Sequence, residues 1–329
     1  MQGILVTGAT GCTGAGVLHY LVSKGYKNIY GMTRREPKDK IHNVKYVFGD
    51  LTEKSSIQKI LKENEIDSIW HIGAAVHTNV KKKDFARVNF EGTKNIIQSA
   101  VEFRIKNIIF ASTTAVYGKL KDFPVKETHR IKPKGLYSKS KYNAEVLIKL
   151  LCEENKINGS IVRIPIIIGK HDRHFFPVVS KLVKINLMPI IGKPFHKVSI
   201  VHPYDIGQAF EILNHNGKEK IESYNVVSEN PPYKELIDKV EKFVVGKKRI
   251  KLYLPYFLVF IVFWVYEILH WIFAYGKQPI INREYARMIG KEWCFDIEKL
   301  KHLGYTPRMN LEDIIEDVVS EEIFPIPET

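Results

Sequence analysis

The sequence predicts an α/β protein built on a doubly wound parallel sheet, with helices on both faces. Short apolar runs alternate with segments of helical periodicity through the first half of the chain. Such alternation is typical of parallel sheets whose strands are joined by helices. The first apolar run, residues 4–6, also passes through closely spaced glycines directly into a helical pattern.

The glycine stretch after residues 4–6 is the strongest local signal. Gly8, Gly11 and Gly14 recur at spacings of three and open a helical pattern. Such a turn lets the backbone approach a pyrophosphate and points a helix N-terminus at it. A purely structural glycine turn is the alternative, but the strand before it and the helix after it favour a dinucleotide site. The predicted contacts in this turn are Gly8, Thr10, Gly11, Cys12, Thr13 and Gly14.

The second predicted strand, residues 29–33, bears on the choice of cofactor. A dinucleotide fold usually places an acidic residue at its end, to bind the ribose hydroxyls of NAD. Arg34 and Arg35 stand there instead, and guanidinium groups can bind the 2′-phosphate of NADP. We therefore expect NADP, with NAD as the alternative. Two exposed surface arginines without a ligand are the other interpretation.

The next two strands, 44–48 and 67–72, also end in candidate cofactor contacts. Asp50 and Leu51 follow the first, and Asp50 either accepts from the adenine amino group or caps a helix over 53–63. Small residues 73–75 follow the second and leave room for a ligand at the sheet edge. The cofactor contacts expected beyond the glycine turn are Arg34, Arg35, Asp50, Leu51, Ala74, Asn89, Ser112, Tyr137, Lys141, Pro165 and Ile167.

A catalytic group is predicted around Tyr137 and Lys141. The two residues are four apart in a helical pattern, so they share one face. A phenol has an unperturbed pKa of about 10, and a nearby ammonium lowers it. The tyrosine can then exchange a proton with an alcohol or ketone while hydride moves to or from nicotinamide. A hydroxyl at the end of the strand 108–111, from Ser112 or Thr113, can hold the reacting oxygen.

Together these motifs resemble the extended short-chain dehydrogenase/reductase family, also described as NAD-dependent epimerases and dehydratases. The motifs that carry the resemblance are Thr7–Gly14, Asp50-Leu51, Asn89, Ser112–Gly118, Tyr137–Lys141 and Arg163–Pro165. The resemblance implies a Rossmann fold, catalytic roles for Thr113, Tyr137 and Lys141, and a contact of Lys141 with the nicotinamide ribose. Lys170 stands where the family usually has proline.

Two regions are expected. Residues 1–168 form the dinucleotide-binding core, and 169–329 mostly form the substrate-binding region. Within the latter, 198–215 returns to the core, and His202 is expected to be structural rather than a substrate contact. Residues 253–275 form a strongly apolar helix, too short to span a bilayer and interrupted by Glu267.

This apolar segment favours a place in the membrane interface. Tyrosine and tryptophan residues typical of the interfacial zone occur along it, and a basic cluster precedes it. The basic residues are Lys247, Lys248, Arg249 and Lys251. A buried helix that covers the substrate pocket, or a dimer contact, is the alternative. The segment resembles the 3β-hydroxysteroid dehydrogenase branch of the family, which implies a lipid- or sterol-like substrate.

The expected activity is hydride transfer between NAD(P) and a hydroxyl or keto group of such a substrate. A sugar-nucleotide epimerase or dehydratase with bound NAD is the alternative, for which Arg173, Lys193 and Lys197 are candidate partners of the diphosphate. A non-catalytic nucleotide-binding scaffold is disfavoured by the retained Thr113, Tyr137 and Lys141.

Composition limits the partners and the compartment. A net charge of +14 comes without a nucleic-acid motif, so we expect no nucleic-acid partner. Three scattered cysteines form neither a disulfide framework nor a metal site. The expected protein is cytoplasmic, peripheral on the membrane through 253–275, and a possible homodimer.

Overall fold

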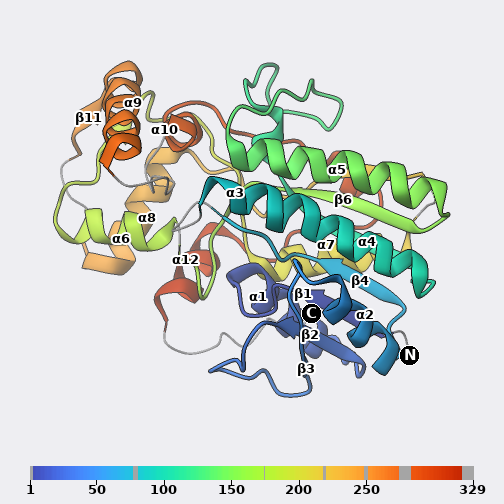
Figure 1. The fold of residues 1–329 in the computed structure, drawn as a ribbon. Coiled ribbons are helices and arrows are strands. Elements are labelled where there is room, and N and C mark those ends of the chain that lie inside the picture. The colour runs from blue at the N-terminus through green and yellow to red at the C-terminus, as the bar shows by residue number, and fades with distance from the viewer. Residues whose placement is uncertain are drawn as a thin grey trace.

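The computed structural model describes residues 3–76, 81–173, 175–217, 220–247, 251–273 and 283–320. Its centre is a seven-stranded sheet in the order β10-β6-β5-β4-β1-β2-β3, with every neighbouring pair parallel (Figure 1). The strands are β1 (Ile4–Thr7), β2 (Ile29–Thr33), β3 (Lys45–Phe48), β4 (Ser68–His71), β5 (Asn107–Thr113), β6 (Asn158–Ile164) and β10 (Glu222–Asn225). This is the predicted doubly wound order, which reverses direction between β1 and β4.

Helices cover both faces of the sheet, as predicted. On one face α1 (Cys12–Ser23) packs against α7 (Pro203–His215), and a Cβ on Gly16 would lie 2.2 Å from the Pro203 Cβ. The other face carries α2 (Lys54–Glu63), α4 (Gly92–Glu102) and α5 (Leu136–Glu154). Because both faces are covered, β1 and β4 are buried along their whole length.

A short helical run connects β4 to α4 on the second face. It consists of α3 (Lys82–Asp84) and η1 (Phe85–Glu91), and η1 has π-helical geometry. After β5 comes the 3-10 turn η2 (Thr114–Tyr117). Single π-helical turns are rare and occur often at functional sites, because they redirect side chains from the regular helical positions.

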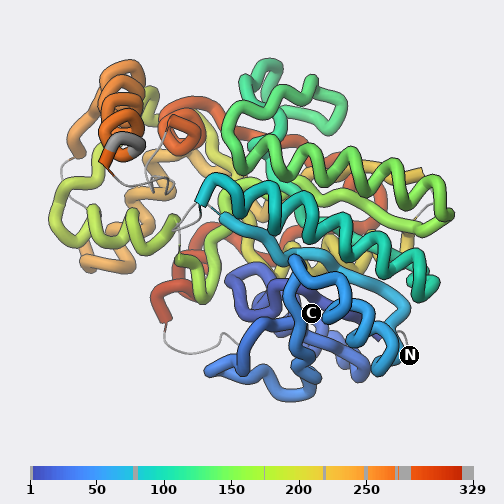
Figure 2. The backbone as a smooth tube through the Cα atoms, in the orientation of Figure 1, coloured from blue at the N-terminus to red at the C-terminus, as the bar shows by residue number. Residues whose placement is uncertain are grey.

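The second region lies beside the carboxyl end of the sheet (Figure 2). Two short parallel pairs belong to it: β7 (Ile166–Ile167) with β9 (Ile200–Val201), and β8 (Ile190–Ile191) with β11 (Tyr253–Leu254). Its helices are α6 (Phe176–Lys184), α8 (Tyr233–Val245), α9 (Tyr256–Phe273), α10 (Arg283–Gly290), α11 (Glu298–Lys301) and α12 (Leu311–Val319). A separate hydrophobic cluster holds α6, α8 and α12 together.

The central sheet contains one strand, β10, from outside the segments that were expected to form the core. The returning segment contains β9 and α7, which packs on α1. In addition, β10 pairs with β6, although residues 222–225 were not among those expected to rejoin the core. Tyr224 and Val226 belong to the same hydrophobic cluster as β1 and α1, which explains why this strand is held there.

The apolar segment begins differently from the prediction. Residues 253–254 form β11, and the helix starts only at Tyr256. The helix α9 lies with α10 at the end of the molecule remote from β3 (Figure 1). The expected end of the helix at Tyr275 falls outside the described residues. Among the residues that are described, no helix is long and apolar enough to cross a membrane.

Candidate active site

The point where the sheet order reverses is fixed by Thr7 at the end of β1. Its Oγ1 accepts the N–H groups of Ile72 and Gly73 at 3.0 and 2.9 Å and lies 2.8 Å from Nδ1 of His71. A Cβ on Gly8 would lie 2.7 Å from the Cα of Gly73. The two backbones therefore meet here without side chains between them, at the position where doubly wound folds bind their ligands.

His71 supports this junction in its neutral form. Its Nε2 lies 2.9 Å from Oγ1 of Thr93, so both ring nitrogens have hydroxyl partners. Burial, together with the charge of Lys141, lowers the pKa of His71 to about 3. The uncharged ring can act as donor to one threonine and acceptor from the other.

The glycine turn has the geometry of a phosphate cradle. Gly8 has φ of 71°, Gly11 donates to the Gly8 carbonyl at 3.0 Å, and a Cβ on Gly14 would lie 2.1 Å from that oxygen. Helix α1 begins directly afterwards, with no side-chain cap and no acidic residue in its first turn. Its N–H groups and positive dipole end can therefore receive a diphosphate. Thr10 is exposed here, and Cys12 and Thr13 are half-buried.

The cofactor contacts predicted after β2 and β3 are either exposed or already hydrogen-bonded to neighbouring residues. Arg34 and Arg35 follow β2 and are both exposed. The Asp50 carboxylate accepts both the N–H and the O–H of Thr52 at 2.8 Å. The predicted capping role is wrong, because α2 begins after Glu53 and has no side-chain cap. Burial opposes ionisation of Asp50, but the bonds from Thr52 and the charges of Arg34 and Arg87 lower its pKa.

The side chain of Asn89, a predicted cofactor contact, is hydrogen-bonded to other parts of the protein. Its amide oxygen accepts from the Ala75 N–H at 2.7 Å, and its amide nitrogen donates to the Ala75 carbonyl and the Ser140 hydroxyl, both at 3.0 Å. Asn89 is buried on the π-helical turn η1. This side chain therefore ties the small-residue loop after β4, which includes Ala74, to α5.

The two candidate hydroxyls at the end of β5 have different surroundings. Ser112 is buried and donates to Glu145 at 2.5 Å. Thr113 is half-buried, and its Oγ1 accepts the Ala115 N–H at 3.2 Å, which leaves its O–H to be donated. The structure therefore favours Thr113 as the hydroxyl that meets a substrate.

Ser112 belongs to a buried ionic network. The Glu145 carboxylate accepts from Nε and Nη2 of Arg163 at 3.1 and 2.8 Å. The Arg163 guanidinium also donates to the Tyr117 hydroxyl at 3.1 Å, and that hydroxyl donates to Asn225. Arg163, from the family motif, is thus a structural residue that joins α5 to β6 and β10.

Tyr137 and Lys141 lie in the first two turns of α5, which packs against β5 and η2. The Lys141 ammonium lies 4.0 Å from the centre of the Phe110 ring, and burial lowers the pKa of Lys141 to about 7. Burial raises the pKa of Tyr137, with contributions from Glu284 and Tyr285. The expected drop in the Tyr137 pKa is therefore not found, because burial and the neighbouring Glu284 and Tyr285 all raise it.

Glu284 is a residue at this site that sequence reasoning missed. From α10 its carboxylate accepts from the Ser138 hydroxyl at 3.3 Å and crowds Gly135, where a Cβ would lie 2.2 Å from the Glu284 Oε1. Burial raises its pKa. No local pattern points to Glu284, because its partners at the start of α5 are far away in the sequence.

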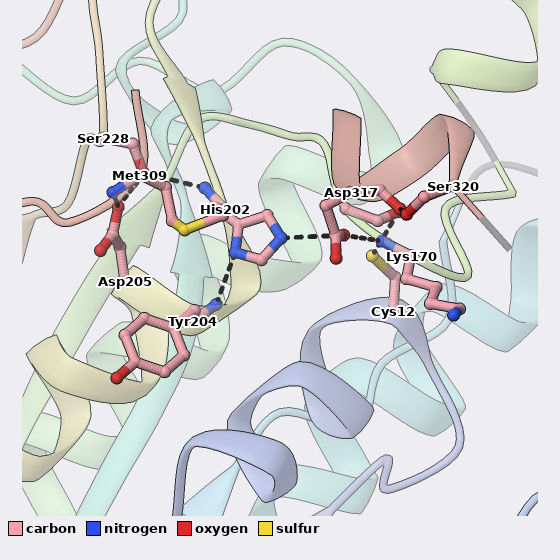
Figure 3. A network of polar contacts seen from close by, with 10 residues as sticks. Cys12, Lys170, His202, Tyr204, Asp205, Ser228, Met309, Asp317 and Ser320 are labelled. Carbon is pink, nitrogen blue, oxygen red and sulfur yellow. Dashed lines mark hydrogen bonds and ion pairs between the residues drawn. The ribbon is translucent and has the colours of Figure 1, made fainter. Parts of the chain in front are cut away.

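The loop after β7 is tied to α12 by a network of polar contacts (Figure 3). The Lys170 N–H donates to Asp317 of α12 at 2.9 Å, a bond that the family's usual proline cannot make. His202 Nε2 lies 3.1 Å from the same carboxylate, while its Nδ1 accepts the Tyr204 N–H and caps α7. His202 is therefore structural, as expected. The Cys12 thiol lies 3.7 Å from the Gly169 carbonyl.

Two groups of predicted residues remain, namely three cofactor contacts and three cations that could bind a diphosphate. Leu51 is buried beside Gly73, Pro165 links β6 to β7, and Ile167 ends β7 at half-burial. The three cationic candidates for a diphosphate, Arg173, Lys193 and Lys197, are all exposed.

Two glycine variants separate packing from cofactor binding. We expect Gly14→Ala to destabilise the protein, because the new methyl group would meet the Gly8 carbonyl. Gly11→Ala has 3.4 Å to the same oxygen, so it should keep the wild-type stability and lose dinucleotide affinity instead. Urea unfolding and nicotinamide fluorescence measure the two effects. Equal unfolding free energies and equal dinucleotide affinities of the two variants would contradict the role of the glycine turn in binding phosphate.

A variant of the buried network tests its role in stability. Glu145→Ala leaves the buried Arg163 charge without its carboxylate partner and the Ser112 hydroxyl without its acceptor, which should cost about 3–5 kcal/mol of unfolding free energy. Glu63→Ala, which removes an exposed partner of Lys59, should cost less than about 1 kcal/mol. Urea denaturation measures both, and a loss of similar size in the two variants would exclude a structural role for the network.

Comparisons with known proteins agree with this geometry. The family model described as "NAD dependent epimerase/dehydratase family" matches residues 4–226. The chain is 26% identical over 308 residues to the uncharacterized protein y4nG of Sinorhizobium fredii, covering 92% of this chain and 74% of y4nG. It is 27% identical over 216 residues to UDP-glucose 4-epimerase of Mus musculus, covering 59% and 61%. The chain spans 43% to 74% of the length of the curated relatives that it matches.

A solved structure shares the fold over nearly the whole chain. The Bordetella bronchiseptica enzyme WbmH in complex with NAD+ superposes with a TM-score of 0.75 at 17% identity, covering 97% of each chain. From the match over residues 4–226, together with the glycine cradle and the sheet order, the chain belongs to the NAD-dependent epimerase/dehydratase family, with a Rossmann-like fold.

Proposed function

We propose that this protein is an NAD(P)-dependent sugar-nucleotide epimerase or dehydratase in which Tyr137 moves the proton. The observation that carries the proposal is the packing of α5, which holds Tyr137 and Lys141, against β5, which ends at Thr113. The membership of the family and the names of its relatives support a nucleotide sugar as substrate.

The three side chains have separate tasks in this proposal. Thr113 donates to the substrate oxygen, and Tyr137 takes the proton from that oxygen or returns it. Lys141 binds the nicotinamide ribose and stabilises the phenolate when Tyr137 is deprotonated. Nicotinamide, when bound, accepts and returns the hydride. Burial raises the Tyr137 pKa and favours the neutral phenol, which is the form that returns a proton to the ketone. For the oxidation of the carbinol, the charge of Lys141 has to favour the phenolate.

Within the family, epimerisation fits these residues better than dehydration. Loss of water from a sugar needs a further acid–base pair besides the group that exchanges the hydroxyl proton. Thr114 and Ala115, which follow Thr113, carry no carboxylate. Glu284 does lie beside Tyr137, but it is engaged with Gly135 and Ser138. A single proton-transfer centre is sufficient to oxidise a carbinol and reduce the ketone from its other face.

A lipid- or sterol-like alcohol is the second candidate substrate. It was the preferred expectation from the sequence, and the relatives favour the sugar nucleotide over it. The apolar side chains exposed on α9 are the one observation in its favour. They lie in the same region as α10, which carries Glu284 next to Tyr137.

NADP is the proposed cofactor, with NAD as the alternative named by the family. Arg34 and Arg35 are exposed where β2 ends and can reach a 2′-phosphate. The next acidic residue, Glu36, forms an exposed ion pair with Lys40. The end of β2 therefore presents positive charge to the ribose.

A homodimer also belongs to this proposal. Val146 and Leu150 lie one turn apart on α5 and are 48% and 53% exposed. Such an apolar pair on a long helix suits a helix-to-helix contact between two copies.

Tyr137→Phe tests the proton-transfer role. We expect it to bind the dinucleotide as the wild type does and to lose activity by about a hundred-fold or more. The assay follows UDP-sugars by NMR with NAD+ or NADP+ present, and Tyr142→Phe on the same helix is the control. Net NADPH oxidation with a sterol ketone, without sugar conversion, would overturn the sugar-nucleotide proposal in favour of the second candidate.

The cofactor preference is tested at the end of β2. Replacing Arg34 and Arg35 by Ala should weaken NADPH binding by about 10–100-fold and leave NADH binding nearly unchanged. Dissociation constants from nicotinamide fluorescence measure this, with the exposed Lys38→Ala as control. Tighter binding of NADH than NADPH by the wild type would contradict the preference.

A further inference from the structure

Helix α9 presents an apolar surface to the outside of the protein. At least two-fifths of each of the following residues is exposed, with Phe273 at 72% and Val262 at 63% the most exposed. This α9 apolar surface consists of Phe257, Leu258, Ile261, Val262, Trp264, Val265, Tyr266, Ile268, Leu269 and Phe273. Soluble monomers rarely expose contiguous apolar patches larger than a few hundred Å², so the surface needs a partner.

The polarity of α9 is the reverse of that of an ordinary surface helix. Its polar residues Glu267 and His270 lie on the half-buried side, with Tyr256 and Phe260. Glu267 accepts the N–H of Arg283 at 2.9 Å and pairs with its guanidinium at the start of α10. At about 100° per residue, the exposed apolar positions cover roughly 200° of the helix circumference.

This wide arc distinguishes a lipid surface from a second protein chain. A helix packed against another helix buries a narrow stripe along one face. A helix lying in the membrane interface buries its whole apolar side at once. Aromatic Trp264 and Tyr266 lie within the arc, as is usual in the interfacial zone.

Positive charges flank the same helix. The Lys291 ammonium lies 4.4 Å from the centre of the Tyr256 ring, and the Arg287 guanidinium carbon lies 5.4 Å from that of Phe260. The whole chain carries +14. Such charges attract the headgroups of an anionic leaflet.

Lys251, expected from the sequence to do the same, is instead buried in ion pairs with Asp238 and Glu241. Lys248 and Arg249 lie outside the described residues.

We propose that α9 lies in the surface of an anionic lipid bilayer and holds the enzyme there, parallel to the membrane plane. The described part of the helix has 18 residues, and at about 1.5 Å per residue it is shorter than the roughly 30 Å hydrocarbon core. Glu267 would also be costly inside that core, but it stays on the protein side, bound to Arg283.

This docking places the active site close to the membrane. The pair of Glu267 and Arg283 joins α9 to α10, and the next residue, Glu284, contacts Ser138 beside Tyr137. The α9 apolar surface is thus connected to the surroundings of Tyr137 through contacts of α9 with α10 and of α10 with α5. The inference goes beyond the proposed activity and holds for a sugar nucleotide or a lipid-like substrate.

Flotation of the full-length protein with vesicles tests the docking. The vesicles contain phosphatidylcholine with a minority of phosphatidylserine. The wild type should float with them, whereas the triple variant Phe257→Gln, Val262→Gln, Leu269→Gln should partition about a hundred-fold less. These side chains are exposed, so the variant should unfold at the wild-type urea concentration.

A matched control carries three exposed apolar residues away from α9. The variant Phe48→Gln, Phe123→Gln, Val319→Gln should float as the wild type does. Failure of the wild type to float would overturn the proposal. So would a wild-type oligomer that the α9 variant dissociates without any change in flotation, since a second copy would then be the partner. Neither readout depends on the cofactor or on turnover.

Discussion

The contact on which the active site depends is the junction between β1 and β4. Thr7 accepts two backbone N–H groups from the end of β4, and the glycines on either side let the chains approach without Cβ atoms. This approach fixes where the sheet order reverses, and with it the direction in which α1 points its N-terminus. Doubly wound folds bind their ligands at such a reversal, so this constraint determines the position of the proposed dinucleotide site.

Local patterns in the sequence predicted the elements near this junction. The strand at 29–33, the glycine turn and the pair Tyr137 and Lys141 were found from spacing alone, since their signals lie within a few residues. Interactions between distant segments gave no such signal. The bond of Ser112 to Glu145, the carboxylate of Glu284 and the pairing of β10 each join residues far apart in the chain.

Burial makes the electrostatics of the site differ from simple charge pairing. The sequence suggested an ammonium that lowers the pKa of a phenol, yet burial lowers the pKa of Lys141 and raises that of Tyr137. Both shifts favour the uncharged forms of the two side chains. A bound nucleotide that carries a positive nicotinamide ring would favour the phenolate, so cofactor binding and proton transfer are expected to be coupled.

A crystal structure of the protein with NADP+ tests the central claim most directly. The account predicts the diphosphate at the N-terminus of α1, the 2′-phosphate at Arg34 and Arg35, and the nicotinamide between Thr113 and Tyr137 with Lys141 on its ribose. Density for the nucleotide at any other part of the chain would contradict the account. So would a crevice in which Thr113 and Tyr137 lie too far apart to reach one substrate oxygen.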